Sequence, residues 1–321
     1  MSELIHPELS DIISAHERIK PYIHHTPVLT SGQMNSIFNA DLYFKCENLQ
    51  KVGAFKARGA SNAISLLSED EIRKGVVTHS SGNHAAALAY AAGLRGARAY
   101  IVMPENSPKV KQRAVASYGG EISFCTPTLQ AREETATKII EDKGAIFIHS
   151  YGNFNVVCGQ GTSALELITD HPDLDIVVSP VGGGGLLSGT VTAIKGIKPS
   201  VQVFGAEPAG ADDTYRSFNS GEYIPYHRPD SIADGLLTTL SRLTFGIIRK
   251  QVDNIFLTSE ASIIECMRLV WERMKIIIEP SSAVALAVIK ENPEAFRGRK
   301  VGVIVSGGNV DFDKFGFSWQ P

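Results

Sequence analysis

One lysine stands in a setting that favours covalent chemistry. Lys56 lies in the stretch Gly53-Ala54-Phe55-Lys56-Ala57-Arg58-Gly59-Ala60, with Phe55 and Ala57 as its direct neighbours. An amine with little around it to solvate the charged form loses its proton easily, and a neutral amine forms a Schiff base with an aldehyde. An ordinary lysine at a helix N-terminus explains this stretch equally well on its own, so the rest of the chain has to decide.

A second stretch, residues 78–84, combines several donors just after a predicted strand and opens an Ala-rich helix. Backbone N–H groups at a helix start bind anions, and polar side chains there add further donors. We expect a carboxylate site; a serine N-cap followed by turn residues is the alternative. The side chains concerned are those of Ser80, Ser81, Asn83 and His84.

The tetraglycine run Gly182-Gly183-Gly184-Gly185 also joins a predicted strand to a predicted helix. Four glycines expose a row of backbone N–H groups, which suits a phosphate. The dinucleotide pattern Gly-x-Gly-x-x-Gly fails in every register, and no Gly-Lys-Ser/Thr follows to make a P-loop. The run therefore predicts a phosphorylated cofactor that is not a nucleotide.

Two further loops follow predicted strands. Ser306-Gly307-Gly308-Asn309 offers a hydroxyl that could hydrogen-bond a ring nitrogen, although a simple glycine turn would look the same. Glu207 and Asp213 lie six positions apart with a free carbonyl between them, a set that can bind Mg²⁺ or Ca²⁺ through oxygen. The alternative is that Asp212 and Asp213 cap the next helix while Glu207 is solvated.

Composition excludes several classes of protein. The formal net charge of −3 provides no basic field for nucleic acid. No apolar run approaches the roughly 18 residues of a membrane helix, and the first residues lack the plan of a signal peptide. The four cysteines, Cys46, Cys125, Cys158 and Cys266, form no Cys-x-x-Cys pair. Free thiols in a reducing cytoplasm fit this spacing better than disulfides or zinc.

The periodicity predicts an α/β fold with two open, mostly parallel sheets flanked by helices. Strands alternate with helices of 10–15 residues, an order that requires right-handed crossovers. Residues 73–148 form a regular α/β unit, which we expect to be a small domain inserted into a larger one made by residues 1–72 and 149–321. Ligands of open α/β sheets bind beyond the strand C-termini, so the cleft between the two units is the expected site.

The four motifs, in this order, resemble those of the fold-type II pyridoxal phosphate enzymes, and within them the serine racemase and serine/threonine dehydratase family. The similarity runs from about Thr26 to Asp311. It implies that Lys56 binds pyridoxal phosphate, with Phe55 and Asn83 at its ring and 3′-oxygen. It further implies that Gly182, Gly183, Gly184 and Gly185 bind the phosphate and Ser306 the pyridine nitrogen. The substrate carboxylate would meet Ser80, Ser81, Asn83 and His84.

Two details resemble the racemases more than the plain dehydratases. Ser81 stands where degradative threonine dehydratases tend to have alanine, and would deliver a proton on the face opposite Lys56. Glu207, the Ala211 carbonyl and Asp213 match the racemase cation site, which implies bound Mg²⁺, or Ca²⁺ or Mn²⁺. The resemblance also implies a homodimer. The predicted function is racemisation of serine with dehydration of L-serine or L-threonine to a keto acid and ammonia.

Three alternatives remain open at this point. Arg132 lies where racemase relatives have an arginine that can reach a second carboxylate, which would make L-threo-3-hydroxyaspartate the substrate; a solvated arginine is the simpler interpretation. A β-replacement enzyme such as a cysteine synthase would share the fold, although Ser81 and the Glu207–Asp213 loop argue against it. A non-catalytic regulator that only binds amino acid or cofactor is the third, because fold alone does not prove activity.

Overall fold

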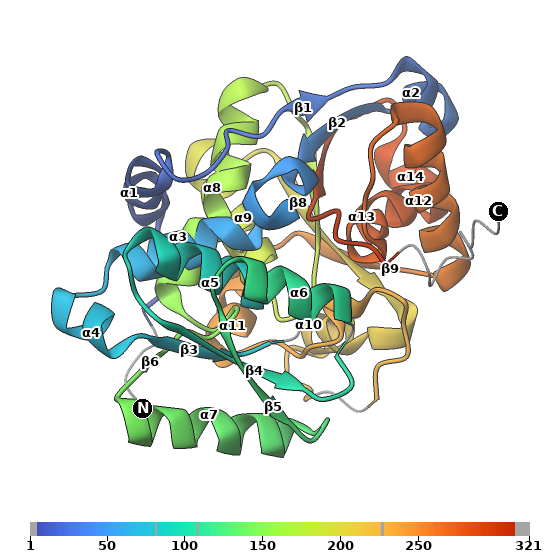
Figure 1. The fold of residues 1–321 in the computed structure, drawn as a ribbon. Helices are drawn as coiled ribbons and strands as arrows, with labels where there is room; N and C mark the ends of the chain where they lie inside the picture. The colour runs from blue at the N-terminus through green and yellow to red at the C-terminus, as the bar shows by residue number, and fades with distance from the viewer. Residues whose placement is uncertain (1–4, 81, 108, 226–227, 312–321) are drawn as a thin grey trace.

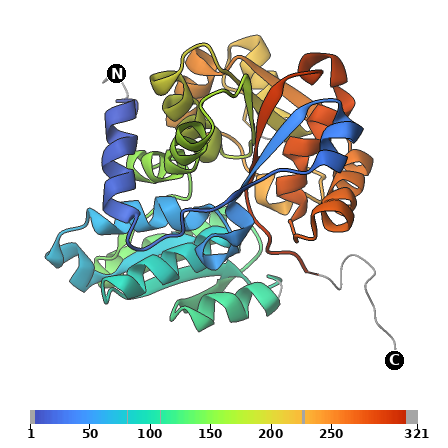
Figure 2. The same ribbon diagram turned by 90° about the horizontal axis from the view of Figure 1, so that it is seen from above.

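The computed structural model describes residues 5–80, 82–107, 109–225 and 228–311, which fold into two sheets flanked by helices (Figures 1 and 2). Ser81, one of the predicted site residues, lies outside the described residues. Within these ranges, no helix is long and apolar enough to cross a membrane.

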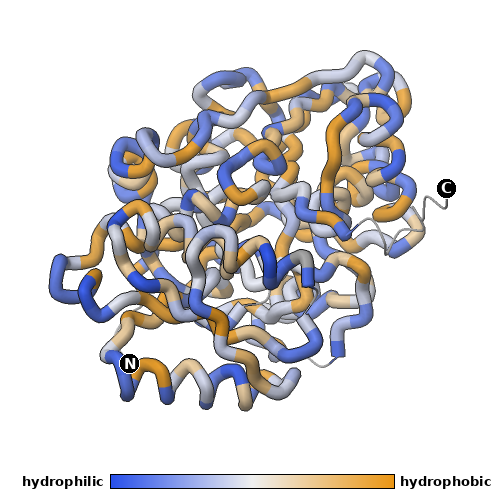
Figure 3. The backbone as a smooth tube through the Cα atoms, in the orientation of Figure 1, coloured by the Kyte–Doolittle hydropathy of each residue, from blue (hydrophilic) through white to orange (hydrophobic). Residues whose placement is uncertain are grey.

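The smaller sheet has four parallel strands in the order β5-β4-β3-β6. Its strands are β3 (Val76–His79), β4 (Ala99–Pro104), β5 (Glu121–Cys125) and β6 (Ile146–Phe147), and its helices are α5 (Asn83–Leu94), α6 (Lys109–Ser117) and α7 (Leu129–Lys143). In Figure 1, α5 and α6 lie above the sheet and α7 below it. The α7 tube alternates between hydrophilic and hydrophobic segments (Figure 3), as expected for a helix that packs one face on a sheet.

The larger sheet has six strands in the order β1-β2-β10-β7-β8-β9. They are β1 (Val28–Leu29), β2 (Asp41–Cys46), β7 (Ile176–Pro180), β8 (Gln202–Pro208), β9 (Asn254–Thr258) and β10 (Lys300–Val305). Only β1 runs antiparallel to its neighbour. Strands β7 and β10 are almost entirely apolar, which fits a parallel sheet covered on both faces.

Helices cover both faces of the larger sheet and form two separate cores. One core joins the sheet to α12 (Glu260–Met274), α13 (Pro280–Glu291) and α14 (Pro293–Phe296), and the other joins it to α8 (Phe154–Asp170), α9 (Gly185–Ile197) and α11 (Arg242–Gln251). The remaining helices and turns are α1 (Leu9–Ile19), α2 (Gly32–Phe38), α3 (Lys56–Ser65), α4 (Glu69–Lys74), α10 (Asp213–Ser220), η1 (Glu47–Leu49), η2 (Lys51–Gly53), η3 (Ala209–Ala211) and η4 (Asp234–Leu236).

The predicted alternation of strands and helices is confirmed, with shifts at the ends of elements. The sequence predicts the lysine helix over residues 54–67, and in the structure it spans Lys56–Ser65. The sequence predicts a loose, polar stretch over residues 208–235, which in the structure contains α10, and it predicts no strand where β9 lies. The division of the chain at residues 72 and 148 remains a prediction, although the four-stranded sheet lies entirely between those positions.

Candidate active site

Lys56 is the first residue of α3 and is held from two sides. The backbone N–H of Phe55 donates to the Ser306 carbonyl at 3.0 Å, which ties the lysine turn to the end of β10. The Lys56 Nζ donates to the Ser150 carbonyl at 3.0 Å. Burial lowers the pKa of Lys56 to about 8, against an opposing effect of the Glu279 carboxylate. The neutral amine, which is the form that reacts with an aldehyde, is therefore reached at a lower pH than for an ordinary lysine.

The first turn of α3 is anchored by a buried cluster of four charges. Arg58 donates to both oxygens of Glu47, at 2.7 and 2.8 Å, and to both oxygens of Glu166, at 2.7 Å each. Lys45 donates to Glu166 at 2.6 Å and to the Thr26 carbonyl at 2.7 Å. All four charged residues are buried and their charges cancel. The cluster joins α3 to β2, η1 and α8.

Glycines allow α3 to approach α8 closely. A Cβ on Gly159 would lie 2.6 Å from the Gly59 Cα and from the Arg58 carbonyl oxygen. The Gly59 N–H donates to the Gln160 side chain at 3.2 Å. The lysine helix is thus fixed against the helix that directly follows the Ser150 segment.

Ser80 and His84 flank the start of α5, and the charge of Lys56 acts on His84. Ser80 Oγ accepts from the Gly82 N–H at 3.3 Å. His84 is 2% exposed, and its Nε2 lies 3.2 Å from the Ile148 carbonyl oxygen. Burial, with the nearby Lys56 charge, lowers the pKa of His84 to about 3, so the ring is neutral. Since a neutral ring must donate from Nε2 to that carbonyl, Nδ1 is an acceptor, and it has no partner among the described residues.

Glu279 is a site residue that sequence reasoning missed. Asn83 Nδ2 donates to its two carboxylate oxygens at 3.0 and 3.1 Å, and Asn83 Oδ1 accepts from Asn309 at 3.0 Å. Burial raises the pKa of Glu279 to about 7, while the bond from Asn83 opposes this. In the sequence, Glu279 precedes Pro280 and looks like the residue before a helix; it is indeed the N-cap of α13, but its side chain makes no capping bond.

The tetraglycine run forms the turn between β7 and α9, as predicted. Gly184 has a φ of +82°, a conformation that favours glycine. In the described part of the chain, the N–H groups of Gly182, Gly183 and Gly184 donate no hydrogen bond, although all three residues are buried. Buried, unpaired N–H groups that point from one turn are what a phosphate requires.

Ser306 follows β10 and is 2% exposed. Its hydroxyl lies 3.0 Å from that of Ser282, which itself donates to the Gly307 carbonyl at 2.7 Å. Ser282 also accepts from the Gly307 N–H at 2.7 Å. Because Ser282 gives its single hydroxyl proton to Gly307, Ser306 is the donor in its contact with Ser282, and the Ser306 oxygen can still accept a hydrogen bond.

Arg132 lies in the first turn of α7, near the C-terminal end of β3. Burial lowers the pKa of His79, and the charge of Arg132 lowers it further. Burial raises the pKa of Tyr151, and the charge of Arg132 opposes this slightly. The Arg132 Nε donates to the Thr128 carbonyl at 3.4 Å. Across residues 5–80, 82–107, 109–225 and 228–311, no carboxylate pairs with it. Arg132 is half-buried, and among the described residues it forms no ion pair.

The N-terminus of α10 is capped by Glu207 rather than by Asp212 or Asp213. Asp212 is the N-cap of α10 but makes no side-chain capping bond, and Glu207 is 1% exposed rather than solvated. Glu207 accepts from the Thr214 and Tyr215 N–H groups at 3.0 and 2.7 Å. Burial raises the pKa of Glu207 to about 8 and that of Asp213 to about 6. Asp213 Oδ2 has no partner among the described residues.

These donors fit a hard cation. A hollow of about 290 Å³ lies against Ala211 and Asp213, but Glu207 does not line it, whereas Arg216 and Arg228 do. No group of three His, Cys, Asp or Glu side chains within the described ranges could hold a metal ion, so a site here needs the Ala211 carbonyl as a ligand.

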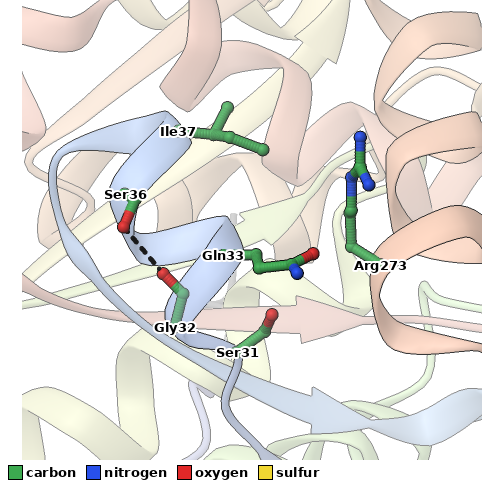
Figure 4. A pocket seen from close by; sticks show the side chains of 6 residues that line it. All are labelled: Ser31, Gly32, Gln33, Ser36, Ile37 and Arg273. Carbon is green, nitrogen blue, oxygen red and sulfur yellow. Dashed lines mark hydrogen bonds between the residues drawn. The ribbon is translucent and has the colours of Figure 1, made fainter.

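A second, open hollow lies away from all of these residues, between α2 and α12. It is lined by Ser31, Gly32, Gln33, Ser36, Ile37 and Arg273 (Figure 4). The Ser36 hydroxyl donates to the Gly32 carbonyl at 3.0 Å, and no site residue named above faces it.

Comparison with known proteins agrees with this geometry. The family model of pyridoxal-phosphate dependent enzymes matches residues 19–307. The chain is 53% identical to serine racemase of Dictyostelium discoideum, over 94% of this chain and 95% of that protein. It is 49% identical to β-hydroxyaspartate dehydratase of Paracoccus denitrificans, over 96% and 98%. The structure of maize serine racemase superposes with a TM-score of 0.94, at 41% identity and over 97% and 96% of the chains. The chain therefore belongs to the fold-type II pyridoxal-phosphate-dependent enzymes.

Proposed function

We propose that this enzyme racemises serine and dehydrates L-serine and L-threonine to a keto acid and ammonia. The observation that carries the proposal is the buried Lys56 amine, with its pKa near 8, fixed between Ser150 and the end of β10. The resemblance to serine racemases over nearly the whole chain supports it.

Each polar group has a role in this proposal. Lys56 and the N–H groups of residues 182–185 would hold pyridoxal phosphate, with Ser306 at its ring nitrogen and Phe55 at its ring. The bound cofactor supplies an electron sink for the bond that breaks at Cα. Freed Lys56 removes the Cα proton as general base.

The fate of the substrate then depends on a second proton donor. Ser80, Asn83 and the neutral His84 would hold the substrate carboxylate, with Asn83 also reaching the 3′-oxygen. Delivery of a proton from Ser81 on the opposite face gives the D-amino acid. Departure of the β-hydroxyl instead gives the keto acid and ammonia. The role and position of Ser81 rest on the sequence alone.

Two finer points belong to the same proposal. A Mg²⁺ ion, or Ca²⁺ or Mn²⁺, held by Glu207, Asp213 and the Ala211 carbonyl would relieve the repulsion between two buried carboxylates. A homodimer is proposed from family resemblance, and the four buried free cysteines favour a reducing cytoplasm.

A second function is favoured by Arg132. Arg132 is half-buried, has no ion-pair partner among the described residues and acts on His79 at the end of β3, and an arginine can bind a second carboxylate with two hydrogen bonds. L-threo-3-hydroxyaspartate carries that carboxylate, and its elimination would use the same lysine. The similarity to the Paracoccus dehydratase supports this candidate.

The deciding assay measures keto-acid release from L-serine, L-threonine and L-threo-3-hydroxyaspartate, with Mg²⁺ present. Lys56→Ala should abolish every activity, while Lys74→Ala, at an exposed position on α4, should not. Turnover by Lys56→Ala would refute the proposed function. A preference for serine that Arg132→Ala leaves intact favours the racemase; a preference for hydroxyaspartate that Arg132→Ala removes favours the dicarboxylate dehydratase.

A further inference from the structure

The first turn of α11 packs against the tetraglycine turn. Thr244 is 0% exposed, and its hydroxyl donates to the Gly183 carbonyl at 2.9 Å. A Cβ on Gly184 would lie 2.9 Å from the Thr244 Cβ and 2.6 Å from the Leu240 Cδ2. One face of the turn is therefore covered by Leu240 and Thr244, and neither residue has a part in the function proposed above.

The bond from Thr244 fixes the direction of the next backbone N–H. Gly183 and Gly184 are joined by a trans peptide bond, in which the C=O and the N–H point in opposite directions within one plane. Since the Gly183 carbonyl is turned toward α11, the Gly184 N–H is turned away from α11. That N–H is one of those in the turn that meet no acceptor in the described part of the chain. The Thr244 hydroxyl thus directs a free donor of the turn.

The Thr244 hydroxyl has one proton, and its other contacts leave that proton for Gly183. Its oxygen accepts from the Ser241 N–H at 2.9 Å and lies 3.0 Å from the Ser241 hydroxyl, which can donate to it. Its distance to the Ser241 carbonyl is 3.2 Å, longer than its bond to the Gly183 carbonyl. One donor and two acceptor positions are then all used. Ile247 of the same helix shares a buried core with Leu187 of α9, so the hydroxyl comes from a fixed position.

We propose that Thr244 is a positioning residue for the cofactor phosphate, because it holds the Gly183–Gly184 peptide unit with its N–H toward that phosphate. This inference rests on the proposed phosphate site at residues 182–185. No second donor reaches the buried Gly183 carbonyl among the described residues. Without the hydroxyl, the carbonyl would turn toward water in the cofactor-free protein and carry the Gly184 N–H with it. Binding would then have to turn the peptide unit back, which lowers the affinity for a phosphate.

The test measures binding of pyridoxal phosphate and of pyridoxal to the cofactor-free protein by fluorescence titration. Pyridoxal has the same ring and aldehyde but no phosphate, so the reaction with Lys56 contributes to both affinities. Thr244→Val keeps the shape of the side chain and removes the hydroxyl. It should weaken pyridoxal phosphate binding about tenfold and pyridoxal binding by at most about twofold. Thr244→Ser keeps the hydroxyl and should restore the wild-type preference for the phosphorylated ligand.

Two control variants separate the bond to Gly183 from general effects on this region. Thr192→Val removes another buried threonine hydroxyl, which donates to the Ser188 carbonyl at 2.9 Å within α9, and should change neither affinity. Ser241→Ala removes the N-cap side chain of α11 and should lower the free energy of unfolding, while the preference for pyridoxal phosphate stays.

The outcomes separate this inference from the function on which it rests. Wild-type protein that binds pyridoxal as tightly as pyridoxal phosphate would refute the phosphate site itself. A wild-type preference that persists in Thr244→Val would refute the role of Thr244 alone. Equal weakening of both ligands in Thr244→Val would assign the residue to packing and overturn the proposal. Loss of the preference in Thr244→Ser, which keeps the hydroxyl, would overturn it as well, whether or not Thr244→Val folds.

Discussion

Replacement of Glu166 by glutamine tests whether the buried charge cluster fixes the lysine helix. Glu166 accepts from Arg58 and Lys45, and the substitution leaves those two cations facing Glu47 alone. Gln keeps the shape of the side chain, so the perturbation is one unit of charge at a position that is 3% exposed.

Two arguments give the same free-energy cost for Glu166→Gln. Removal of one partner from a buried ion pair typically costs about 3–5 kcal/mol. Independently, burial raises the pKa of Glu166, but the hydrogen bonds and charges of Arg58 and Lys45 outweigh it and lower the pKa from 4.5 to about 2. At roughly 1.36 kcal/mol for each pKa unit, this corresponds to about 3 kcal/mol. We expect Glu166→Gln to lower the free energy of unfolding by about 3 kcal/mol at pH 7.5.

The assay is urea denaturation of the wild type, Glu166→Gln, Lys45→Met and the double variant. Each single change leaves one net buried charge, whereas the double change restores neutrality. The double variant should therefore lose roughly 2 kcal/mol less than the two single losses added together. Glu272→Gln breaks the exposed pair with Arg268 and should cost less than about 1 kcal/mol.

The pH dependence of the protein's stability follows from the Glu166 carboxylate. Its pKa is lower in the folded protein, so its contribution is complete above about pH 4.5 and is lost as pH falls toward 2. The stability difference between wild type and Glu166→Gln should therefore shrink over that window. A loss below 1 kcal/mol at pH 7.5, or strictly additive effects in the double variant, would refute charge balance as the reason for the cluster.

Four further outcomes are expected. Gly183→Ala places a Cβ 2.4 Å from the Tyr151 ring and should weaken pyridoxal phosphate binding at least tenfold by fluorescence titration; unchanged affinity would contradict the close packing of this turn. The rate of cofactor uptake should rise with pH through about 8, because only neutral Lys56 attacks an aldehyde, and a flat profile between pH 6.5 and 9.5 would contradict the lowered pKa. Ser81→Ala should suppress D-serine formation while largely sparing keto-acid release; equal loss of both would mean that Ser81 only positions substrate. Asp213→Asn should abolish any stabilisation of the wild type by Mg²⁺ in thermal unfolding, and chelation that changes neither stability nor activity of the wild type would argue against the cation site.

The fold was predictable because strands, glycine turns and helices alternate locally. The β7–Gly182 turn and the β3–Ser80 loop each carry their signal within about ten residues, and parallel strands bring such loops to one edge of a sheet. Strand β9 was not predicted because Asn254–Thr258 is short and half-exposed and has no glycine-rich loop after it. Helix α10 was not predicted because it follows a stretch rich in turn residues.

The missed site residues depend on contacts between distant parts of the chain. Glu279 meets Asn83 across 196 positions, and nothing local distinguishes it from an ordinary residue before a helix. Glu166 meets Arg58 across 108 positions, so the charge balance of the cluster is visible only after folding. Tyr151 carries no motif, and its packing against Gly183 and Gly185 is visible only in the folded structure. The sequence shows which residue types are present, whereas only the folded structure shows which of these residues contact one another.

The position of β10 has a consequence for synthesis of the chain. It is the last described strand, yet it lies between β2 and β7 in the larger sheet, and it pairs Val305 with Cys46. The sheet cannot be completed until residue 305 has left the ribosome, whereas the smaller sheet is complete by residue 147. We therefore expect the smaller unit to fold first, while strands β1 and β2 stay without their sheet neighbour β10 until it has been synthesised. Ser306 directly follows β10, and its carbonyl accepts the hydrogen bond from the Phe55 N–H. The nascent chain therefore acquires its cofactor site only at the final stage of folding.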